Sequence, residues 1–331
     1  MLQAMKLLAI FTMTALAAGC TSETAGEDGP GGEATDESDF TSREGYAALR
    51  NPRGGVYVSV AAYGKRAFLG DNQRGIDIVD LTTMKPAGTI AGKIPADSLS
   101  VAGRTLAACG DRDDQPLNWD AVYGASDRNY IITLIDARTG AKKIEIALRL
   151  QKYLESSSSS GFIDLPNMAC TLAPDGKSIS VSFAQAKLQD EVVTFPLPAA
   201  SISYDFREIP GATRVKVGTS ADNTVTGFSS GPLGLTYAAG GYGLRRIAPN
   251  QTAPRSLRDQ DREHLLGLME RGDRLFTVNH DGALLVLDAQ SGATVASVDV
   301  PDWLEGVAFA GSYVLAVGRA GLMVTKDRWA R

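Results

Sequence analysis

The stretch Ala283–Gly292 reads ALLVLDAQSG: an apolar, strand-forming run that ends in Asp and is followed by small polar residues. Two other segments nearly repeat this phrase, YIITLIDARTG at Tyr130–Gly140 and GIDIVDLTT at Gly75–Thr83. Short apolar runs bounded by Asp, Gly and Ser are typical of β-strands that enter a tight turn. One strand-and-turn unit therefore recurs along the chain, which indicates a repeat architecture.

Each copy of this phrase follows a pair of strands joined by a hairpin turn. In four copies the turn reads YGKR, AGRT, PDGK or RGDR, and the high Gly content, 35 of 331 residues, fits many such turns. The copies are spaced by roughly 40–70 residues, as expected for propeller blades, each of which is a four-stranded sheet. Six copies are found: the hairpins begin at Val58, Leu99, Ala169, Val225, Leu265 and Gly306, and the third strands near Gly75, Tyr130, Glu191, Gly243, Ala283 and Gly321.

The sequence therefore predicts an all-β protein, a six-bladed β-propeller, with seven blades as the alternative. Helical periodicity is confined to Ile144–Leu154 and Asp259–Met269, which excludes a helical solenoid. A β-sandwich would accept as many strands but gives no reason to repeat one phrase. The last copy ends at Arg331 with three strands visible. We therefore expect a strand from the other terminus, Tyr46–Leu49 or Val56–Val60, to complete that blade and close the ring.

Two families of propeller resemble parts of this chain. The segment Lys65–Gly92, KRAFLGDNQRGIDIVDLTTMKPAGTIAG, resembles the LVIVD repeat of bacterial surface propellers, and Ala283–Thr294 is similar to the quinoprotein-type blades of outer-membrane assembly lipoproteins. The resemblance covers two or three blades and implies a propeller fold in the bacterial cell envelope. Pro196 and Arg245–Arg246 stand where those families have apolar residues and Asp, and the tryptophans do not recur at blade spacing: Trp119, Trp303 and Trp329.

The N-terminus carries a processing signal over residues 1–19. Lys6 precedes an apolar run, and the segment ends in LAAGC, which resembles the bacterial lipobox, where small residues precede an invariant Cys. The resemblance implies cleavage before Cys20 and lipid on Cys20, and several acyl chains together anchor a protein stably. Thr21 is not the Asp associated with inner-membrane retention, so we expect an exported lipoprotein in the outer membrane. An ordinary secretory peptide with a coincidental Cys is the alternative.

Residues 20–44 are expected to form a lipidated, acidic and disordered tether. Thr21–Glu44 has eight acidic residues, one Arg and a single large apolar residue, Phe40, so it cannot bury enough surface to order itself. The tether carries −7 and Lys6 carries +1, so the total charge of −5 leaves about +1 on the propeller, residues 45–331. A net charge near zero argues against a nucleic-acid partner, which requires clustered Lys and Arg.

Two further cysteines, Cys109 and Cys170, lie in apolar strands of the second and third copies. Disulfides persist in the oxidising compartment that an exported protein reaches. A bridge between them would close a loop of about 60 residues and contribute roughly 3–4 kcal/mol on the chain-entropy model. Two buried free thiols are the alternative, because geometry decides the pairing.

The long connections of the chain all belong to one face of the predicted propeller. Connections after a second strand and connections between blades emerge on that face, and they include Gly110–Asn129, Leu148–Asn167, Phe206–Thr224 and Pro249–Glu263, whereas the hairpins opposite are short. Elaborated loops on a rigid scaffold typically carry recognition. We therefore place the candidate binding face at Asp111, Asp113, Asp114, Trp119, Asp120, Tyr123, Tyr153, Tyr242, His280, Asp281 and Arg319.

The same residues offer little for catalysis. The aspartates between Asp111 and Asp120 are ligands of the kind that Ca²⁺ prefers, but their spacing matches no EF-hand and a solvated acidic loop is the simpler interpretation. His264 and His280 are the only histidines, a poor stock for metal or acid–base chemistry. The sequence therefore predicts no catalytic residue, no metal and no cofactor.

Two functions remain open. The preferred hypothesis is a lipid-anchored envelope propeller, a monomer or part of a larger complex, that binds an envelope protein or a surface polysaccharide without enzymatic activity. The alternative is a hydrolase or lactonase with a small-molecule substrate in the central channel. Such a site needs polar groups converging from several first strands, and Asp97 and Glu305 are the nearest carboxylates.

Overall fold

The computed structural model describes residues 40–43, 46–52, 54–71, 75–111, 129–149, 168–183, 191–216, 225–239, 243–259, 265–279, 281–300 and 303–329. In these residues regular structure is almost all β-strand, apart from one turn of 3-10 helix, η1 (Phe206–Glu208). None of the described residues belongs to a helix that is long and apolar enough to cross a membrane. The all-β class is confirmed.

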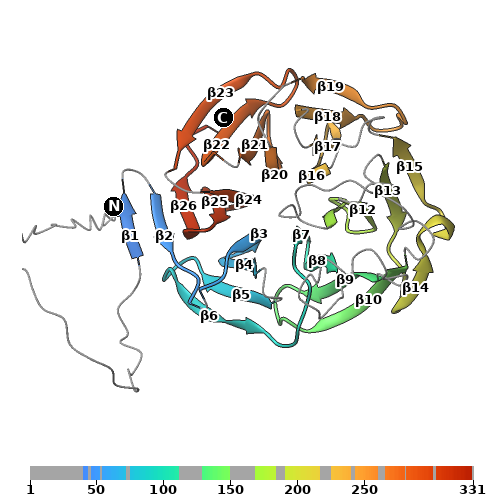
Figure 1. Cartoon of the computed structure of the whole chain (residues 1–331), viewed down its shortest axis with the longest axis horizontal. Coiled ribbons are helices and arrows are strands. Elements are labelled where there is room, and N and C mark those ends of the chain that lie inside the picture. Colours follow the sequence, from blue (N-terminus) through green and yellow to red (C-terminus); the bar gives the residue numbers. More distant parts are fainter. Residues whose placement is uncertain are drawn as a thin grey trace, which may run out of the picture. The chain divides into compact units, whose positions relative to one another are not determined.

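Six sheets are arranged as blades around a common axis, which confirms the six-bladed propeller (Figure 1). Blade 1 consists of β3 (Tyr57–Tyr63), β4 (Arg66–Asp71), β5 (Gly75–Asp80) and β6 (Lys85–Ile90). Blade 2 consists of β7 (Ser98–Ala102), β8 (Thr105–Asp111), β9 (Asn129–Asp136) and β10 (Lys142–Arg149). Blade 3 consists of β11 (Met168–Leu172), β12 (Ser178–Phe183), β13 (Glu191–Pro196) and β15 (Thr213–Lys216). Blade 4 consists of β16 (Val225–Gly231), β17 (Gly234–Ala239), β18 (Gly243–Ile247) and β19 (Arg255–Arg258). Blade 5 consists of β20 (Leu265–Arg271), β21 (Arg274–Asn279), β22 (Ala283–Asp288) and β23 (Thr294–Asp299). Blade 6 contains β24 (Leu304–Ala310), β25 (Tyr313–Gly318) and β26 (Gly321–Lys326).

The sixth blade is completed by strands from the start of the described chain. Strand β2 (Tyr46–Leu49) pairs antiparallel with β26, with Leu49 opposite Leu322, so the expectation that Tyr46–Leu49 closes the ring is confirmed. The other candidate, Val56–Val60, overlaps the first strand of blade 1 and is wrong. Strand β1 (Phe40–Arg43) pairs with the outer edge of β2, although the sequence placed it in the tether. Its backbone covers a sheet edge that would otherwise be open.

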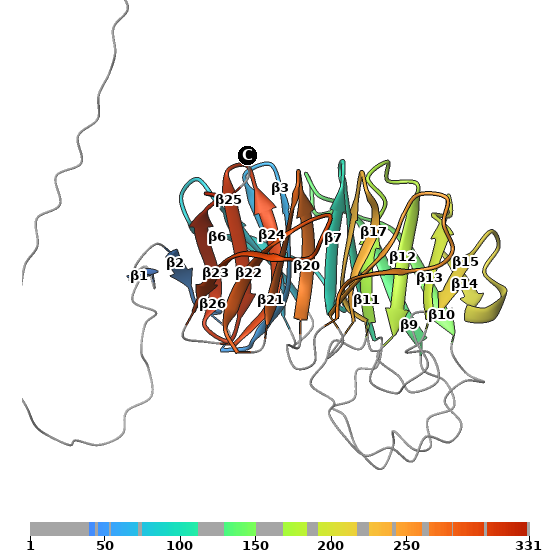
Figure 2. The same cartoon turned by 90° about the horizontal axis from the view of Figure 1, so that it is seen from above.

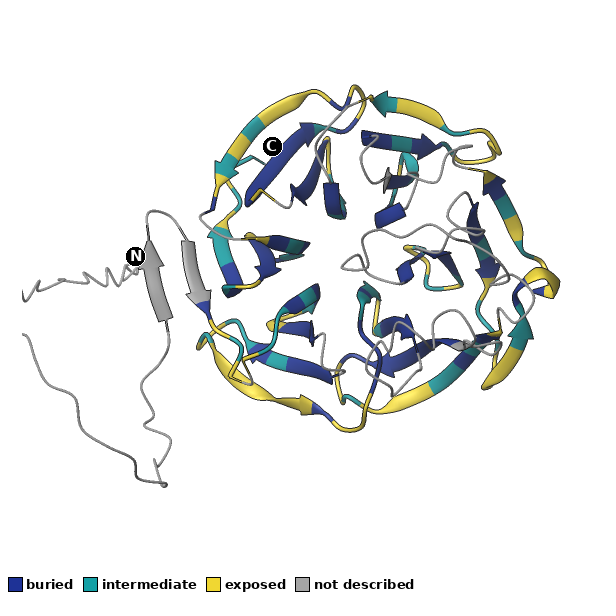
Figure 3. Cartoon of the chain, in the orientation of Figure 1, coloured by how far each residue is buried: buried dark blue, intermediate teal, exposed yellow. Residues whose placement is uncertain are grey.

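The innermost strands form a closed ring around the axis. Each of β3, β7, β11, β16 and β20 contacts the innermost strand of the next blade, and β24 returns to β3. Figure 3 shows that burial is highest in the inner strands and falls towards the outermost strands, which are largely exposed. The core therefore lies between neighbouring blades, where the faces of two sheets pack against each other.

The Asp of the repeated phrase has a structural role. Asp80 Oδ1 accepts hydrogen bonds from the backbone N–H groups of Thr82 and Thr83, and Asp136 and Asp288 bind the N–H groups two and three residues further on in the same way. These bonds are Asx turns that fold the chain from the third strand into the fourth. They also lower the pKa values of Asp80 and Asp288, through the N–H groups that face the carboxylates.

Hydroxyl groups link the innermost strands of neighbouring blades. Ser98 Oγ accepts a hydrogen bond from the Cys170 N–H at 3.1 Å, and Ser100 Oγ accepts one from Leu172 N–H at 2.9 Å. Ser229 Oγ likewise accepts the N–H of Glu270 at 2.7 Å. An innermost strand has a backbone edge with no strand partner, and a buried backbone group left unpaired is costly. The hydroxyls therefore satisfy that edge and join one blade to the next.

The backbones of blades 5 and 6 lie very close together at a glycine. Gly267 has φ +53°, and a Cβ on it would lie 2.8 Å from the Cα of Gly306. A larger residue would be strained in this backbone conformation and would also push the two innermost strands apart.

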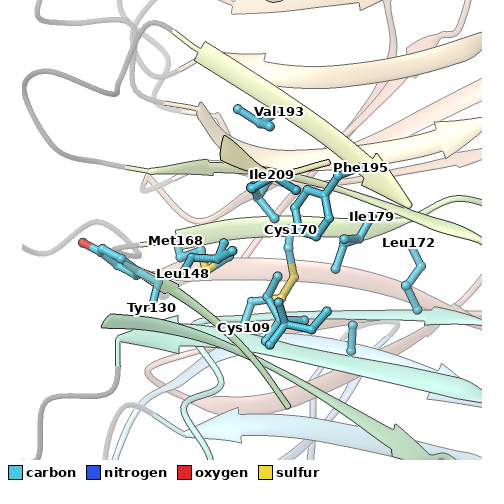
Figure 4. Packing of buried hydrophobic residues seen from close by; sticks show 14 of the residues in the cluster. Cys109, Tyr130, Leu148, Met168, Cys170, Leu172, Ile179, Val193, Phe195 and Ile209 are labelled. Atoms are coloured by element: carbon cyan, nitrogen blue, oxygen red, sulfur yellow. A yellow bond between two sulfur atoms is a disulfide. The ribbon is translucent and has the colours of Figure 1, made fainter. Parts of the chain in front are cut away.

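Blades 2 and 3 are joined covalently and by an exchanged strand. Cys109 of β8 and Cys170 of β11 form a disulfide within a cluster of buried side chains (Figure 4). Strand β14 (Ile202–Asp205), which lies between the third and fourth strands of blade 3, pairs in parallel with β10 of blade 2. The chain then returns through Phe206, whose buried ring packs against Phe183 with 5.0 Å between the centroids.

Two other interpretations of the sequence are corrected by this arrangement. The sequence predicts connections at Phe206–Thr224 and Pro249–Glu263, but these segments contain β15 and β19, the fourth strands of blades 3 and 4. The helical periodicity in Ile144–Leu154 and Asp259–Met269 is misleading, because the described parts of both segments belong to strands β10 and β20. In β10 the apolar residues Ile144, Ile146 and Leu148 in fact alternate with less apolar ones, as in a half-buried strand.

Removal of the disulfide should destabilise the propeller strongly. For Cys109→Ala/Cys170→Ala we expect a loss of about 4 kcal/mol in the free energy of unfolding, because the unfolded chain loses a cross-link over 61 residues. Urea unfolding followed by tryptophan fluorescence measures the change. Reduced wild-type protein is the control and should approach the variant. Equal midpoints for the variant and the oxidised wild type would contradict a stabilising bridge.

Candidate functional site

The propeller has two unlike faces. We call the end that bears the hairpins between first and second strands, and the turns between third and fourth strands, the turn face. We call the opposite end, where each first strand begins and each second strand ends, the loop face. Figure 2 shows the strands running between these two faces. Strands β8, β10, β12 and β15 of blades 2 and 3 all end at the loop face, and the next strands resume after gaps of 17, 18, 7 and 8 residues.

Three candidate binding residues lie in the described part of the chain. Asp111 is the last residue of β8 and only 9% of its surface is exposed, because it lies within the sheet. Asp281 is exposed between β21 and β22, and Arg319 is exposed between β25 and β26, where its N–H donates to the carbonyl of Trp303. The remaining candidates lie outside the described residues: Asp113, Asp114, Trp119, Asp120, Tyr123, Tyr153, Tyr242 and His280, and also Cys20.

Buried carboxylates on blade 1 hold the fold together at the loop face. Asp71 accepts a hydrogen bond from Asn51 Nδ2 at 3.1 Å, which ties the segment after β2 to β4. Asp77 accepts the hydroxyl of Tyr57 at 2.8 Å. A buried carboxylate is stable only with such partners. Among the described residues, no group of three or more His, Cys, Asp or Glu side chains is arranged to hold a metal ion.

The carboxylates that the enzyme hypothesis would use lie apart from these. Asp97 is half-buried just before β7, and its carboxylate lies against the Cα of Gly110, where a Cβ would come within 3.0 Å of Oδ2. Glu305 is half-buried in the irregular start of β24. Both residues are therefore close to the axis, in blades 2 and 6.

An arginine clamp fixes the returning segment of blade 3 near the loop face. Glu191, the first residue of β13, accepts hydrogen bonds from Arg207 Nη1 at 3.0 Å and from Arg214 Nη1 at 3.0 Å. The Arg214 guanidinium also lies over the ring of Phe206, 4.6 Å from its centroid. Charge-assisted bonds of this kind and a cation–π contact reinforce each other. The bases of the connections 184–190 and 217–224 are thereby held in place.

A buried ion pair joins blades 4 and 5. Arg246 is the fourth residue of β18, the place that Ile78 holds in blade 1 and Val286 in blade 5. Its Nη2 lies 3.2 Å from Glu270 Oε2, and its Nε donates to Thr236 Oγ1 at 2.9 Å. Its Nη1 donates to the Ala289 carbonyl of blade 5. Arg246 stands where the similar repeats have an apolar residue, and its charge is neutralised by Glu270 of blade 5.

Burial dominates the electrostatics of this pair. Desolvation raises the pKa of Glu270 and outweighs the opposing effects of the Arg246 charge and the Leu233 N–H. The second carboxylate oxygen, Oε1, is buried and has no hydrogen-bond partner among the described residues. Sequence reasoning noticed the unusual Arg245–Arg246 but could not name Glu270, because the partner is set by the packing of blades.

Comparisons with known proteins support the fold alone. No protein-family profile matches the sequence, and no curated protein sequence matches it either. Among solved structures, a chain from the crystal structure of a nidogen/laminin complex is similar, with a TM-score of 0.54 and 13% sequence identity. The match covers 80% of this chain and 89% of that chain. A likeness at this level of identity shows that the two chains share the propeller fold.

The Arg246–Glu270 pair should give the propeller a pH-dependent weakness when the cation is removed. In Arg246→Met, Glu270 is left buried without a counter-charge, and we expect a loss of about 3–5 kcal/mol in unfolding free energy at pH 7. Because the folded-state pKa of Glu270 is already raised, protonation relieves this penalty: the loss should be smallest near pH 4 and should grow as the pH rises.

Chemical denaturation at several pH values measures this effect. Arg246→Met/Glu270→Leu is the matched control, because it removes both charges and should be nearly independent of pH in this range. A loss for Arg246→Met that stays constant from pH 4 to pH 7 would contradict the account.

Proposed function

We propose that this protein is an exported, lipid-anchored propeller that binds another protein of the bacterial envelope through the connections of blades 2 and 3. It acts as a scaffold and carries out no reaction of its own. A surface polysaccharide is the second ligand class that the sequence left open, and the experiment below distinguishes the two.

The observation that carries this proposal is that contacts which stabilise the fold are concentrated in blades 2 and 3. Blades 2 and 3 share a disulfide and an exchanged strand, and blade 3 also has the arginine clamp on Glu191. The two longest gaps between consecutive strands, 112–128 and 150–167, start from these same blades. Recognition loops work best when their ends are fixed by a rigid scaffold, because less entropy is then lost on binding.

The export half of the proposal rests on the N-terminal sequence and on the disulfide. A bridge between buried cysteines is typical of proteins that fold in an oxidising compartment. The lipobox-like LAAGC supplies Cys20 as the lipid attachment site, and the acidic segment after it would separate the propeller from the membrane. Lipid on Cys20 also explains why the third cysteine is not needed for a bridge.

A protein ligand is favoured over a small molecule. The structurally similar chain comes from a complex of two proteins, nidogen and laminin. A propeller face is broad and suits a partner surface, where tightly packed aromatic and Arg side chains provide most of the binding energy. Trp119 and Tyr123, in the connection after β8, are residues of the type that act as such anchors.

Crosslinking in intact cells tests the binding face. Residues 112–128 are replaced by a Gly/Ser linker of equal length, and the captured material is identified by mass spectrometry. We expect one dominant envelope protein with the wild-type chain and a loss of at least tenfold with the variant. The matched control replaces residues 249–254, a connection at the turn face, and should capture the partner normally. Retained capture by the 112–128 variant would overturn the proposed face, and binding of purified surface polysaccharide alone would replace the protein partner.

Lipid attachment is tested separately. Cells labelled with a radioactive fatty acid should yield labelled wild-type protein in the membrane fraction, and Cys20→Ala should be unlabelled and released as soluble protein. The propeller should be equally stable in both, since Cys20 precedes all described strands. An unlabelled wild-type chain would refute the anchor and leave the binding face untouched.

A further inference from the structure

The turn face carries an uneven distribution of charge. On blades 1 to 3 its described residues, in 63–66, 80–85, 102–105, 136–145, 173–178, 197–201 and 209–213, include eight cationic and four acidic side chains, a surplus of four positive charges. On blades 4 to 6 the corresponding segments, 230–235, 247–255, 270–275, 288–294, 310–313 and 326–329, include five cationic and four acidic side chains, a surplus of one. The positive charge is therefore concentrated on one half of this face.

The four acidic groups of the cationic half differ in exposure: Asp136 is buried, Asp80 and Glu145 are half-buried, and Asp175 is exposed. Asp136 is 6% exposed and lies 2.9 Å from Arg104 Nη2 and 3.2 Å from Lys143 Nζ, while these two cations are about half exposed. Burial alone would raise the pKa of Asp136, but the Lys143 hydrogen bond, two backbone N–H groups and the Arg104 charge hold it well below its usual range. The side chains that meet the solvent on this half are therefore mainly positive.

The fold also brings like charges together there. Arg66 Nη1 donates to the backbone carbonyl of Arg138 at 2.7 Å, which draws the exposed guanidinium of blade 1 to the exposed Arg138 of blade 2. Lys65 and Lys142 lie in the adjacent hairpin and turn, and both are exposed, although Lys142 Nζ also pairs with Glu145. On blades 4 to 6, Arg271 and Arg274 also lie beside carboxylates. Like charges held side by side repel each other unless an anion lies against them.

We propose that the turn face of blades 1 to 3, which we call the cationic face, docks against anionic phospholipid headgroups. Three observations favour a membrane over a folded acidic partner. The first is the charge itself, since basic groups near an anionic surface each strengthen binding by about fivefold. The second is the shortness of the hairpins, which leaves no deep loop to grip a partner. The third is Tyr313, 46% exposed on the same face of the neighbouring blade 6, a residue type common at membrane interfaces.

The anchor and the tether allow this orientation. This inference rests on the lipid anchor of the proposed function, because a surplus of four charges gives weak binding that a tether makes effective. Phe40, where β1 begins, lies opposite Leu49 and therefore near the loop-face end of blade 6. The chain from Cys20 to Phe40 reaches at most about 70 Å, whereas a six-residue strand is only about 20 Å long. The anchored propeller can therefore turn its cationic face to the bilayer and its loop face away from it.

Vesicle sedimentation with the full chain carrying Cys20→Ser tests the face without the anchor. Vesicles of phosphatidylglycerol mixed with phosphatidylcholine are compared with vesicles of phosphatidylcholine alone, at low salt. We expect binding only to the anionic vesicles, weakened at high salt by screening. Lys65→Gln/Arg138→Gln/Lys142→Gln should lower the partition coefficient by about 100-fold, at about fivefold for each charge.

The matched control removes three exposed cations elsewhere: Lys93→Gln/Arg149→Gln/Lys216→Gln. It makes the same change in net charge and should bind within threefold of the parent chain. Equal loss in both triple variants would show that net charge alone acts and would overturn the inference, as would equal binding to both vesicle types. Binding to a soluble acidic protein but not to vesicles would likewise overturn it. None of these outcomes touches lipid labelling at Cys20 or partner capture, so the proposed function is judged independently.

Discussion

Antiparallel pairing between β2 and β26 is the contact on which the other interfaces of this propeller depend. Each blade packs only against its two neighbours, so the core is a circle of interfaces with no centre of its own. If the ring opened at β26, the faces of blades 6 and 1 would be exposed to water, and so would an unpaired strand edge. Closure by a strand from the other end of the described chain makes the six interfaces mutually dependent.

The interfaces between blades differ in chemistry. Blades 2 and 3 share a disulfide, hydroxyl bonds and an exchanged strand. Blades 4 and 5 share a buried ion pair, a hydroxyl bond and a close glycine contact, and blades 5 and 6 share a close glycine contact. Apolar packing between sheets would not specify which blades are neighbours, because one blade face resembles another. A polar or covalent contact is specific to its pair, so these contacts would fix which blade lies beside which.

The sequence was sufficient for the fold because the repeated phrase has a local cause. The Asp that closes the third strand accepts hydrogen bonds from the N–H groups two and three residues further on, so this Asp and its turn can be recognised without knowledge of the tertiary structure. Six repeats then give six blades, and a three-stranded last unit requires a closing strand. The fourth strands β15 and β19 were missed because an exposed outer strand is selected for polarity, and its residues look like those of a loop.

The candidate site was less predictable, because it depends on distances between blades. Cys109 and Cys170 could be named but not joined, and Glu270 could not be matched to Arg246 although the arginine was conspicuous. The cationic face shows the same limit: Lys65 lies in one turn and Arg138 and Lys142 in another, and only the topology places the two turns on one face. Asp111 illustrates the converse, since its place in an acidic segment suggested a surface position and the strand β8 buries it.

The closing pair has a consequence for how the protein is made. Leu49 and Leu322 pair although 273 positions separate them, so β2 cannot pair with β26 until the last blade has been synthesised. Non-local pairing of this kind is slow, because a long loop must close before any contact forms. In the exported chain that we propose, the N-terminus leaves the cytoplasm first, so the ring closes only after the last blade has crossed the membrane. That order would place ring closure in the compartment where the Cys109–Cys170 bridge is stable.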